Sequence, residues 1–92
     1  MPQVFTVGCY VFFFWAGEDG EPIHIHVAVK RPEKHATRFW LLSDGGCRLA
    51  HNASNIPQKD LQKLAKAVTL NHRRICKAWV EAFGEESLSF IG

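Results

Sequence analysis

The sequence contains few cysteines, and their spacing excludes the folds that cysteines usually support. Its 92 residues include three, Cys9, Cys47 and Cys76, with no C-x-x-C pair. An odd number of widely spaced cysteines is neither a disulfide framework nor a zinc ribbon. We therefore expect buried, reduced thiols in a cytoplasmic protein.

A long apolar run is also missing. The longest one, Val4 to Ala16, is interrupted by Thr6 and Gly8, whereas a membrane span needs about 20 apolar residues. No basic segment precedes it, as one would in a signal peptide. We expect no membrane partner and a cytoplasmic location.

Lysine and arginine are absent from the first 29 residues, which carry three acids. All 11 basic residues lie between Lys30 and Lys77, together with only three acids, and three more acids follow Lys77. The net charge of +2 therefore conceals a strongly basic middle. Such a segment favours an acidic partner, either RNA or DNA or a protein. The alternative is a solvated basic surface without a dedicated partner.

Apolar residues are abundant: 47% of the chain is hydrophobic and three residues are tryptophan, which argues against disorder. A chain of this length forms one domain, here 1–92. We divide it into a β-rich part (1–50), a helical part (57–83) and a tail or edge strand (85–92).

Strand patterns fill the β-rich part, at residues 4–7, 10–15, 23–29, 37–42 and 47–50. The segment 10–15 is apolar on both faces, which is typical of a strand that is covered on both sides. A helix should cover one face. We expect a partner chain or a second copy, as in a homodimer, to cover the other.

Apolar residues between Pro57 and Phe83 recur at helical spacing and form one stripe. Six basic residues occupy the opposite side: Lys59, Lys63, Lys66, Arg73, Arg74 and Lys77. A break near residues 69–71 is possible because Thr and Asn are poor helix formers, so the segment forms either one long helix or two consecutive helices. The predicted fold class is α+β: a small, mostly antiparallel sheet of three to five strands packed on these helices.

The segment Glu21–Val27 contains the side chains that best suggest chemistry. His24 and His26 alternate with three aliphatic residues, so in a strand both histidines point to one face. The aliphatic face suits a core, and the histidine face suits water or a ligand.

The order of motifs resembles the bacterial domain-of-unknown-function 4160 family. The matching segments are Met1–Phe5, Gly8–Phe14, Glu21–Val27, Ala36–Leu41, Arg48–Ala50, Asn71 and Trp79–Gly84. The sequence departs from that pattern at Cys9, where a second glycine is common, in a longer loop before the helix, and in the tail Glu85–Gly92. The resemblance implies one half of a two-gene, toxin–antitoxin-like module, often beside a small protein of the domain-of-unknown-function 2442 family. This is an analogy of arrangement and not of chemistry.

Metal binding is one hypothesis for the histidines. His24 and His26 could chelate Zn²⁺ or another divalent ion, with a third ligand from His35, His51, Glu21 or Asp19. No ligand spacing requires this, so we predict no metal and no cofactor and keep His24 and His26 as the weaker alternative.

Two further hypotheses involve nucleic acid. His24 and His26 could form a metal-independent ribonuclease, with Arg38, or alternatively Lys30 or Arg48, holding the phosphate. Alternatively the basic surface could bind nucleic acid without catalysis, with Trp40 as a stacking surface. The residues expected at a binding surface are Glu21, Lys30, Trp40, Arg48, Lys59, Lys63, Lys66, Arg73, Arg74 and Lys77.

We favour a protein-interaction role, in which the basic surface binds an acidic partner protein. The sequence has no nucleophile elbow, phosphate loop or dinucleotide fingerprint that would indicate another enzyme class. We therefore do not favour an enzymatic function. If the protein has an activity, we expect it to be that of a ribonuclease.

Overall fold

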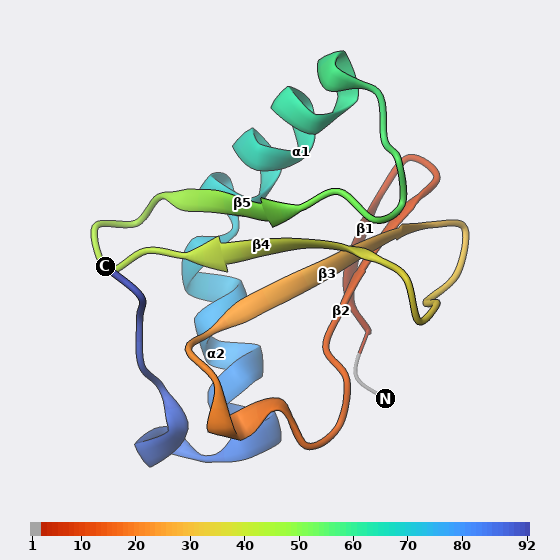
Figure 1. The fold of residues 1–92 in the computed structure, drawn as a ribbon. Coiled ribbons are helices and arrows are strands. Elements are labelled where there is room, and N and C mark those ends of the chain that lie inside the picture. Colours follow the sequence, from red (N-terminus) through yellow and green to blue (C-terminus); the bar gives the residue numbers. More distant parts are fainter. Residues whose placement is uncertain (1–2) are drawn as a thin grey trace.

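The computed structural model describes residues 3–92 as a five-stranded sheet with two helices on one side (Figure 1). The elements are β1 (Gln3–Val7), β2 (Tyr10–Phe13), η1 (Glu18–Gly20), β3 (His24–Val29), β4 (Thr37–Leu41), β5 (Cys47–His51), α1 (Gln58–Leu70), α2 (His72–Phe83) and η2 (Glu85–Ser87). Met1 and Pro2, which open the first quoted motif, lie outside the described residues. The predicted α+β class is confirmed.

The strands pair in chain order, β1-β2-β3-β4-β5, and every pair is antiparallel. Short connections suffice for this meander, because antiparallel neighbours need only a turn between them. β3 lies at the centre of the sheet, so both of its edges are paired and the two histidines sit in the middle of one face.

The helical part contains two helices, because the chain breaks at Asn71, the last position of the segment where a break was possible. The Asn71 side-chain amide donates to the carbonyl oxygen of Ala67 at 2.8 Å, so it satisfies a carbonyl at the end of α1. α2 ends at Gly84, whose φ of 95° is a conformation that glycine adopts readily.

The main core lies between the helices and the adjacent face of the sheet. The aliphatic residues of the histidine strand, Ile23, Ile25 and Val27, are fully buried there, as the alternation predicts. Trp79 of α2 is also fully buried, meets Phe14 edge to face at 5.2 Å, and donates its indole N–H to the Ser87 hydroxyl.

The opposite face of β2 is covered by this same chain, contrary to the expectation of a cover from another chain. Phe13 is fully buried, packs in a small cluster with Val11, Ala28 and Ala36, and meets Trp15 edge to face at 5.1 Å. The segment that follows β2 turns back over the sheet and supplies this cover, so the burial of Phe13 does not require a second copy.

The tail is an extended segment, not an edge strand, within residues 88–92. It runs beside the sheet, where the Ile23 N–H donates to the Ser89 carbonyl at 2.8 Å. His72 lies against it, stacked on Phe90, and its Nε2 is 2.7 Å from the Leu42 carbonyl oxygen. His72 therefore has a packing role with one ring nitrogen hydrogen-bonded to the backbone.

The three cysteines are free thiols. Cys47 and Cys76 are partly buried, and burial raises the pKa of both thiols. Cys9 is exposed, so the expectation that all three are buried is wrong at this position, which lies in the β1–β2 turn. No helix among residues 3–92 is long and apolar enough to span a membrane.

Replacing Trp79 by alanine tests the core. Since Trp79 is fully buried, Trp79→Ala should lower the free energy of unfolding by about 3–5 kcal/mol. Leu70→Ala is the control, because Leu70 is 79% exposed, and it should change stability by less than about 0.5 kcal/mol. Urea denaturation measures both, and a loss below about 1 kcal/mol at Trp79 would contradict the packing.

The titration of Tyr10 tests the contact between β2 and α1. Its hydroxyl donates to Asp60 Oδ2 at 2.7 Å. This hydrogen bond, with smaller contributions from burial and the Asp60 charge, raises the pKa of Tyr10 from 10.0 to about 12. The hydrogen bond therefore stabilises the fold below pH 10, and its contribution disappears as the pH rises through about 12.

Tyr10 is the sole tyrosine, so the absorbance of tyrosinate reports it alone. Asp60→Asn should move the titration midpoint down toward 10. Asp44→Asn should leave the midpoint unchanged. Equal midpoints in the wild type and Asp60→Asn, with circular dichroism confirming the fold, would show that the contact does not form in solution.

Candidate functional site

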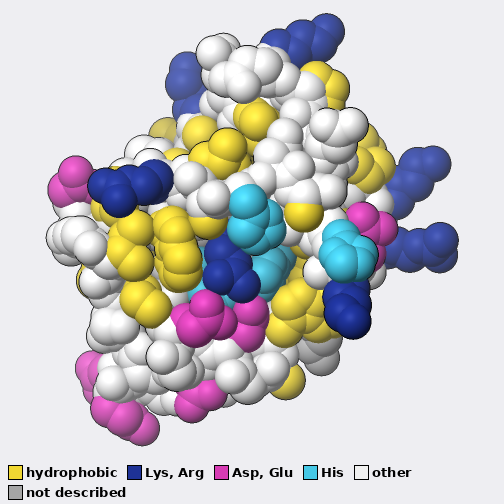
Figure 2. Space-filling view, in the orientation of Figure 1, with side chains coloured by type: hydrophobic (Ala, Val, Ile, Leu, Met, Phe, Trp, Pro, Cys, Tyr) yellow, Lys and Arg dark blue, Asp and Glu magenta, His cyan; other side chains and the backbone are white. Residues whose placement is uncertain are grey.

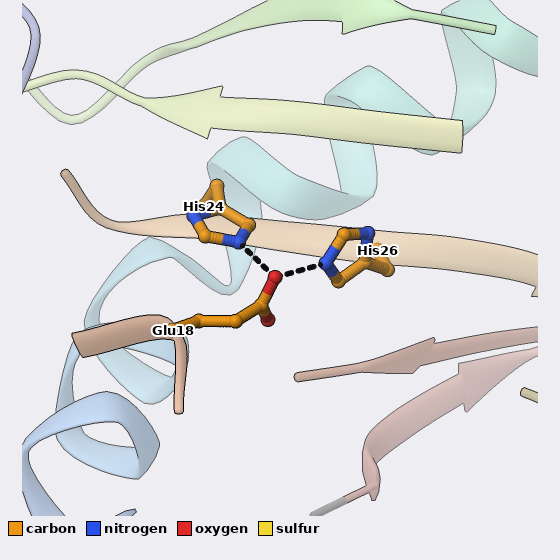
Figure 3. A group of neighbouring side chains, drawn as sticks. All are labelled: Glu18, His24 and His26. Atoms are coloured by element: carbon orange, nitrogen blue, oxygen red, sulfur yellow. Dashed lines mark hydrogen bonds and ion pairs between the residues drawn. The ribbon is translucent and has the colours of Figure 1, made fainter. Parts of the chain in front are cut away.

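The centre of the site is a carboxylate that contacts both histidines of β3 (Figure 3). Oε2 of Glu18 lies 2.8 Å from His24 Nε2 and 2.7 Å from His26 Nε2. Glu18 comes from η1, which folds over the histidine face of the sheet. Gly17 precedes it with φ of 83°, a turn conformation that favours glycine.

The surrounding contacts orient all three side chains. His24 Nδ1 lies 2.9 Å from the Pro22 carbonyl oxygen. That oxygen only accepts hydrogen bonds, so Nδ1 carries the hydrogen. The backbone N–H of Trp15 donates to the other carboxylate oxygen of Glu18 at 2.7 Å. The ring of His24 is also held between Trp40 and Trp79, with centroid distances of 5.5 and 5.4 Å.

The site is nearly closed to water. The side chains of His24, His26 and Glu18 are 0%, 7% and 11% exposed. Burial by itself raises the pKa of the Glu18 carboxyl. Hydrogen bonds from His24, His26 and the Trp15 backbone outweigh that effect and hold this pKa well below its ordinary value of 4.5. Glu18 is therefore a buried, ionised carboxylate at neutral pH.

Arg38 forms the open side of the site. Its Nη1 pairs with Glu21 Oε1 at 3.1 Å, its Nη2 lies 4.0 Å from Glu18 Oε2, and its guanidinium sits over Trp40 at 5.4 Å. Its Nε is buried and has no hydrogen-bond partner among residues 3–92. A space-filling view shows this face, with a basic side chain amid histidines and acids and hydrophobic side chains to either side (Figure 2).

His51 joins the site through an irregularity in β5. Arg38 pairs with His51 but the next residue, Phe39, pairs with Leu49, so Ala50 is an extra residue on β5. This bulge places His51 opposite Arg38, whereas strict alternation would put it on the helix side with Leu49. The predicted strand ended at Ala50 and left His51 in a loop. Burial, Arg38 and His26 lower the pKa of His51.

Strand register brings most of the predicted sheet residues together. Directly paired residues share a face, so His24, Trp40 and Arg48 form one row across the sheet, and His26, Arg38 and His51 form the next. Lys30 does not join them. It follows the end of β3, four residues beyond His26 and thus about 13 Å along the strand direction.

The other predicted binding residues lie elsewhere. Lys59, Lys63, Lys66, Arg73, Arg74 and Lys77 are all exposed on α1 and α2. The molecule therefore carries two separate polar surfaces, which we call the histidine site (Glu18, His24, His26, Arg38 and their neighbours) and the basic helical surface (the six residues just named).

Glu18 is not among the residues predicted from the sequence. The predicted third ligands were Asp19, Glu21, His35 and His51, but Asp19 and His35 are exposed and Glu21 binds Arg38. The available signal was the acidic turn itself, because Glu18, Asp19 and Glu21 directly precede the histidine strand. Which of the three acids turns inward depends on the 3-10 turn, which the composition does not specify.

The geometry limits what the histidines can do. Both ring nitrogens of His24 face protein oxygens and its side chain is fully buried, so it does not reach a substrate in this conformation. His26 is little more accessible. The arrangement suits an ion pair or a metal centre better than the two-histidine acid–base pair of the ribonuclease hypothesis. The accessible imidazole on this face is that of His51.

A family model described as "Domain of unknown function (DUF4160)" matches residues 8–80. The matched range includes the histidine site and all six residues of the basic helical surface. Searches of curated proteins and of solved structures found no match.

Replacing Glu18 by glutamine tests the buried carboxylate. The change leaves two buried histidines without their charged partner, so Glu18→Gln should lower the free energy of unfolding at pH 7 by about 1–3 kcal/mol. Glu21→Gln is the matched control. It removes a carboxylate that is 44% exposed and should cost less than about 1 kcal/mol.

The same variants should also differ in how their free energy of unfolding changes at acidic pH. A carboxyl whose pKa is lower in the folded state stabilises the fold above the unfolded pKa of about 4.5, and this contribution is lost as the pH falls below that value. Wild type and Glu21→Gln should therefore lose more stability in acid than Glu18→Gln. Parallel acid dependence in Glu18→Gln and wild type, measured by denaturant unfolding, would contradict the assignment.

Proposed function

We propose, on the premise that the chain belongs to the family described as Domain of unknown function (DUF4160), that it is an interaction protein. In this proposal the basic helical surface binds an acidic partner protein. The role would be that of one component of a two-gene, toxin–antitoxin-like module in the cytoplasm. A small protein of the domain-of-unknown-function 2442 type is the first partner to test. The family resemblance and the three free thiols support this setting.

The observation that carries the proposal is the unneutralised charge of the helices. All six basic residues of the surface are exposed, while the apolar stripe of both helices is turned into the core. Among residues 3–92, Arg38 is the one lysine or arginine with an acidic side chain within 4.0 Å. The acid nearest in sequence on α1, Asp60, is bonded to Tyr10. An acidic partner would supply the missing countercharge.

The shape of this surface also supports a partner of defined form. Lys59, Lys63 and Lys66 line, with Gln62, a shallow hollow of about 480 Å³. Arg74 and Lys77 line a second hollow of about 660 Å³, whose other walls are the polar Gln3, the acid Glu81 and the apolar Val4, Ala78 and Ala82. Cations beside small apolar side chains suit an acidic polypeptide that also buries some hydrophobic surface.

A protein is favoured over nucleic acid on this surface by the aromatic residues. Single-stranded nucleic acid binds to basic grooves in which aromatic side chains stack on the bases. On the helices the aromatic residues Trp79 and Phe83 belong to or pack against the core, and Trp40 lies on the sheet. The exposed large apolar residue of the helices is Leu70, at 79%. It is a contact that a protein partner would bury.

Charge reversal tests this proposal. Calorimetry would measure binding of the purified product of the adjacent gene to wild type and to the triple variant Lys59→Glu, Lys63→Glu, Lys66→Glu. Each exposed pair contributes about 0.2–1 kcal/mol, and charge reversal replaces that attraction by a repulsion of similar size. Three reversals should therefore weaken binding by about tenfold or more. The matched control reverses Lys30, Arg31 and Lys34, which are exposed in the β3–β4 loop.

The proposal is supported if the helix variant alone loses affinity. It is contradicted if both triple variants weaken binding equally or if neither does. The same proteins would be titrated with single-stranded RNA at low and high salt. Binding to RNA that falls steeply with salt and is lost in the helix variant would instead assign the surface to nucleic acid.

A further inference from the structure

We propose that Glu18, His24 and His26 form a binding site for a divalent transition-metal ion such as Zn²⁺. This inference does not depend on the proposed function, because the three residues lie on the face of the sheet opposite the one that packs against α1 (Figure 3). Each residue offers one ligand atom, and these atoms all lie within 4.8 Å of one another.

The donor set matches the chemistry of such ions. Two imidazole nitrogens and one carboxylate oxygen are ligands of zinc and of non-haem iron, bound at about 2.0–2.2 Å. Ligands at these distances stand about 2.9 Å apart at right angles and about 3.4 Å apart in a tetrahedron. The present nitrogen–oxygen distances are 2.8 and 2.7 Å, and all three atoms lie within 4.8 Å of one another, so a metal ion requires the carboxylate oxygen to move back from the two nitrogens, by up to about 0.7 Å for a tetrahedral site.

The orientation of His24 points to a cation between the three groups. Its Nδ1 donates to the Pro22 carbonyl, so in the neutral ring Nε2 presents a lone pair. That lone pair faces the carboxylate of Glu18 at 2.8 Å, which is unfavourable unless a proton or a metal ion lies between them. An Nδ1–H bonded to a backbone carbonyl is also the contact that commonly fixes a metal-binding histidine.

The supports around the ligands are already in place. The Trp15 backbone N–H holds the second oxygen of Glu18 at 2.7 Å, so Oε2 remains directed at the histidines. Tryptophans flank the His24 ring. Three protein ligands leave at least one coordination position open. Exposure rises from His24 (0%) through Glu18 (11%) to Arg38 (22%), so that position opens toward Arg38.

Arg38 does not oppose a metal ion strongly, because Glu21 pairs with it at 3.1 Å. It also adds a binding preference. A guanidinium beside an open metal position favours an anionic ligand on the ion, and Arg38 Nε still lacks a partner among residues 3–92. The site would therefore bind the metal ion together with a water molecule or a small anion.

The test is calorimetric titration with Zn²⁺ after treatment of the protein with a chelator. All variants carry Cys9→Ser, because the exposed Cys9 thiol is an independent zinc ligand. We expect one Zn²⁺ per chain in wild type and in Asp19→Asn, which removes an exposed carboxylate of the same turn outside the triad. Glu18→Gln should bind at least about 100-fold more weakly, the upper end of what loss of an outer-shell partner costs.

Circular dichroism would confirm that each variant is folded, and His26→Asn takes the place of Glu18→Gln if that variant is not. Binding that is lost with Glu18 or His26 and retained with Asp19→Asn supports the site. Absence of Zn²⁺ binding in wild type, or equal affinity in wild type and the triad variants, overturns it and leaves the triad as a buried ion pair.

Discussion

A single carboxylate oxygen holds together the side chains on the histidine face of this sheet. Glu18 Oε2 contacts both histidines, while its partner oxygen is tied to the Trp15 backbone. Ionised groups in a nearly dry setting persist only when their bonding capacity is used. This requirement explains why η1 must close over β3 and why two tryptophans and an arginine gather around the same point.

Local patterns were sufficient to predict most of the fold. Strict alternation placed Ile23, Ile25 and Val27 in the core and both histidines on the other face, and the helical stripe placed Trp79 inside. These predictions succeed because side chains in a strand or helix repeat at a fixed period, so the apolar face of each element can be identified and packs into the main core. Propensity, a local property, marked residues 69–71 as a possible break, but it did not decide between one helix and two, and the structure places the break at Asn71.

The parts of the site that were missed depend on contacts between distant residues. Glu18 meets β3 only because an irregular turn aims it inward, and His51 meets Arg38 only because β5 holds one extra residue. Neither a 3-10 turn nor a bulge has a periodic signature. The prediction that the histidine face is exposed was wrong for the same reason. The loop after β2 covers this face, and the alternation of residues along a strand does not predict the path of a loop.

The segment from Trp15 to Glu18 has two roles in one short loop. Trp15 shields Phe13 by its indole ring, and its backbone N–H holds Glu18 on the histidines. Lifting this loop would therefore hydrate an aromatic cluster and uncouple the carboxylate in one step. Both events occur in the same opening of the loop and therefore have the same free energy of opening. A ligand that binds Glu18 in the closed loop thus also keeps the Phe13–Trp15 cluster away from water. Occupancy of the site and the wetting of this face are thermodynamically linked.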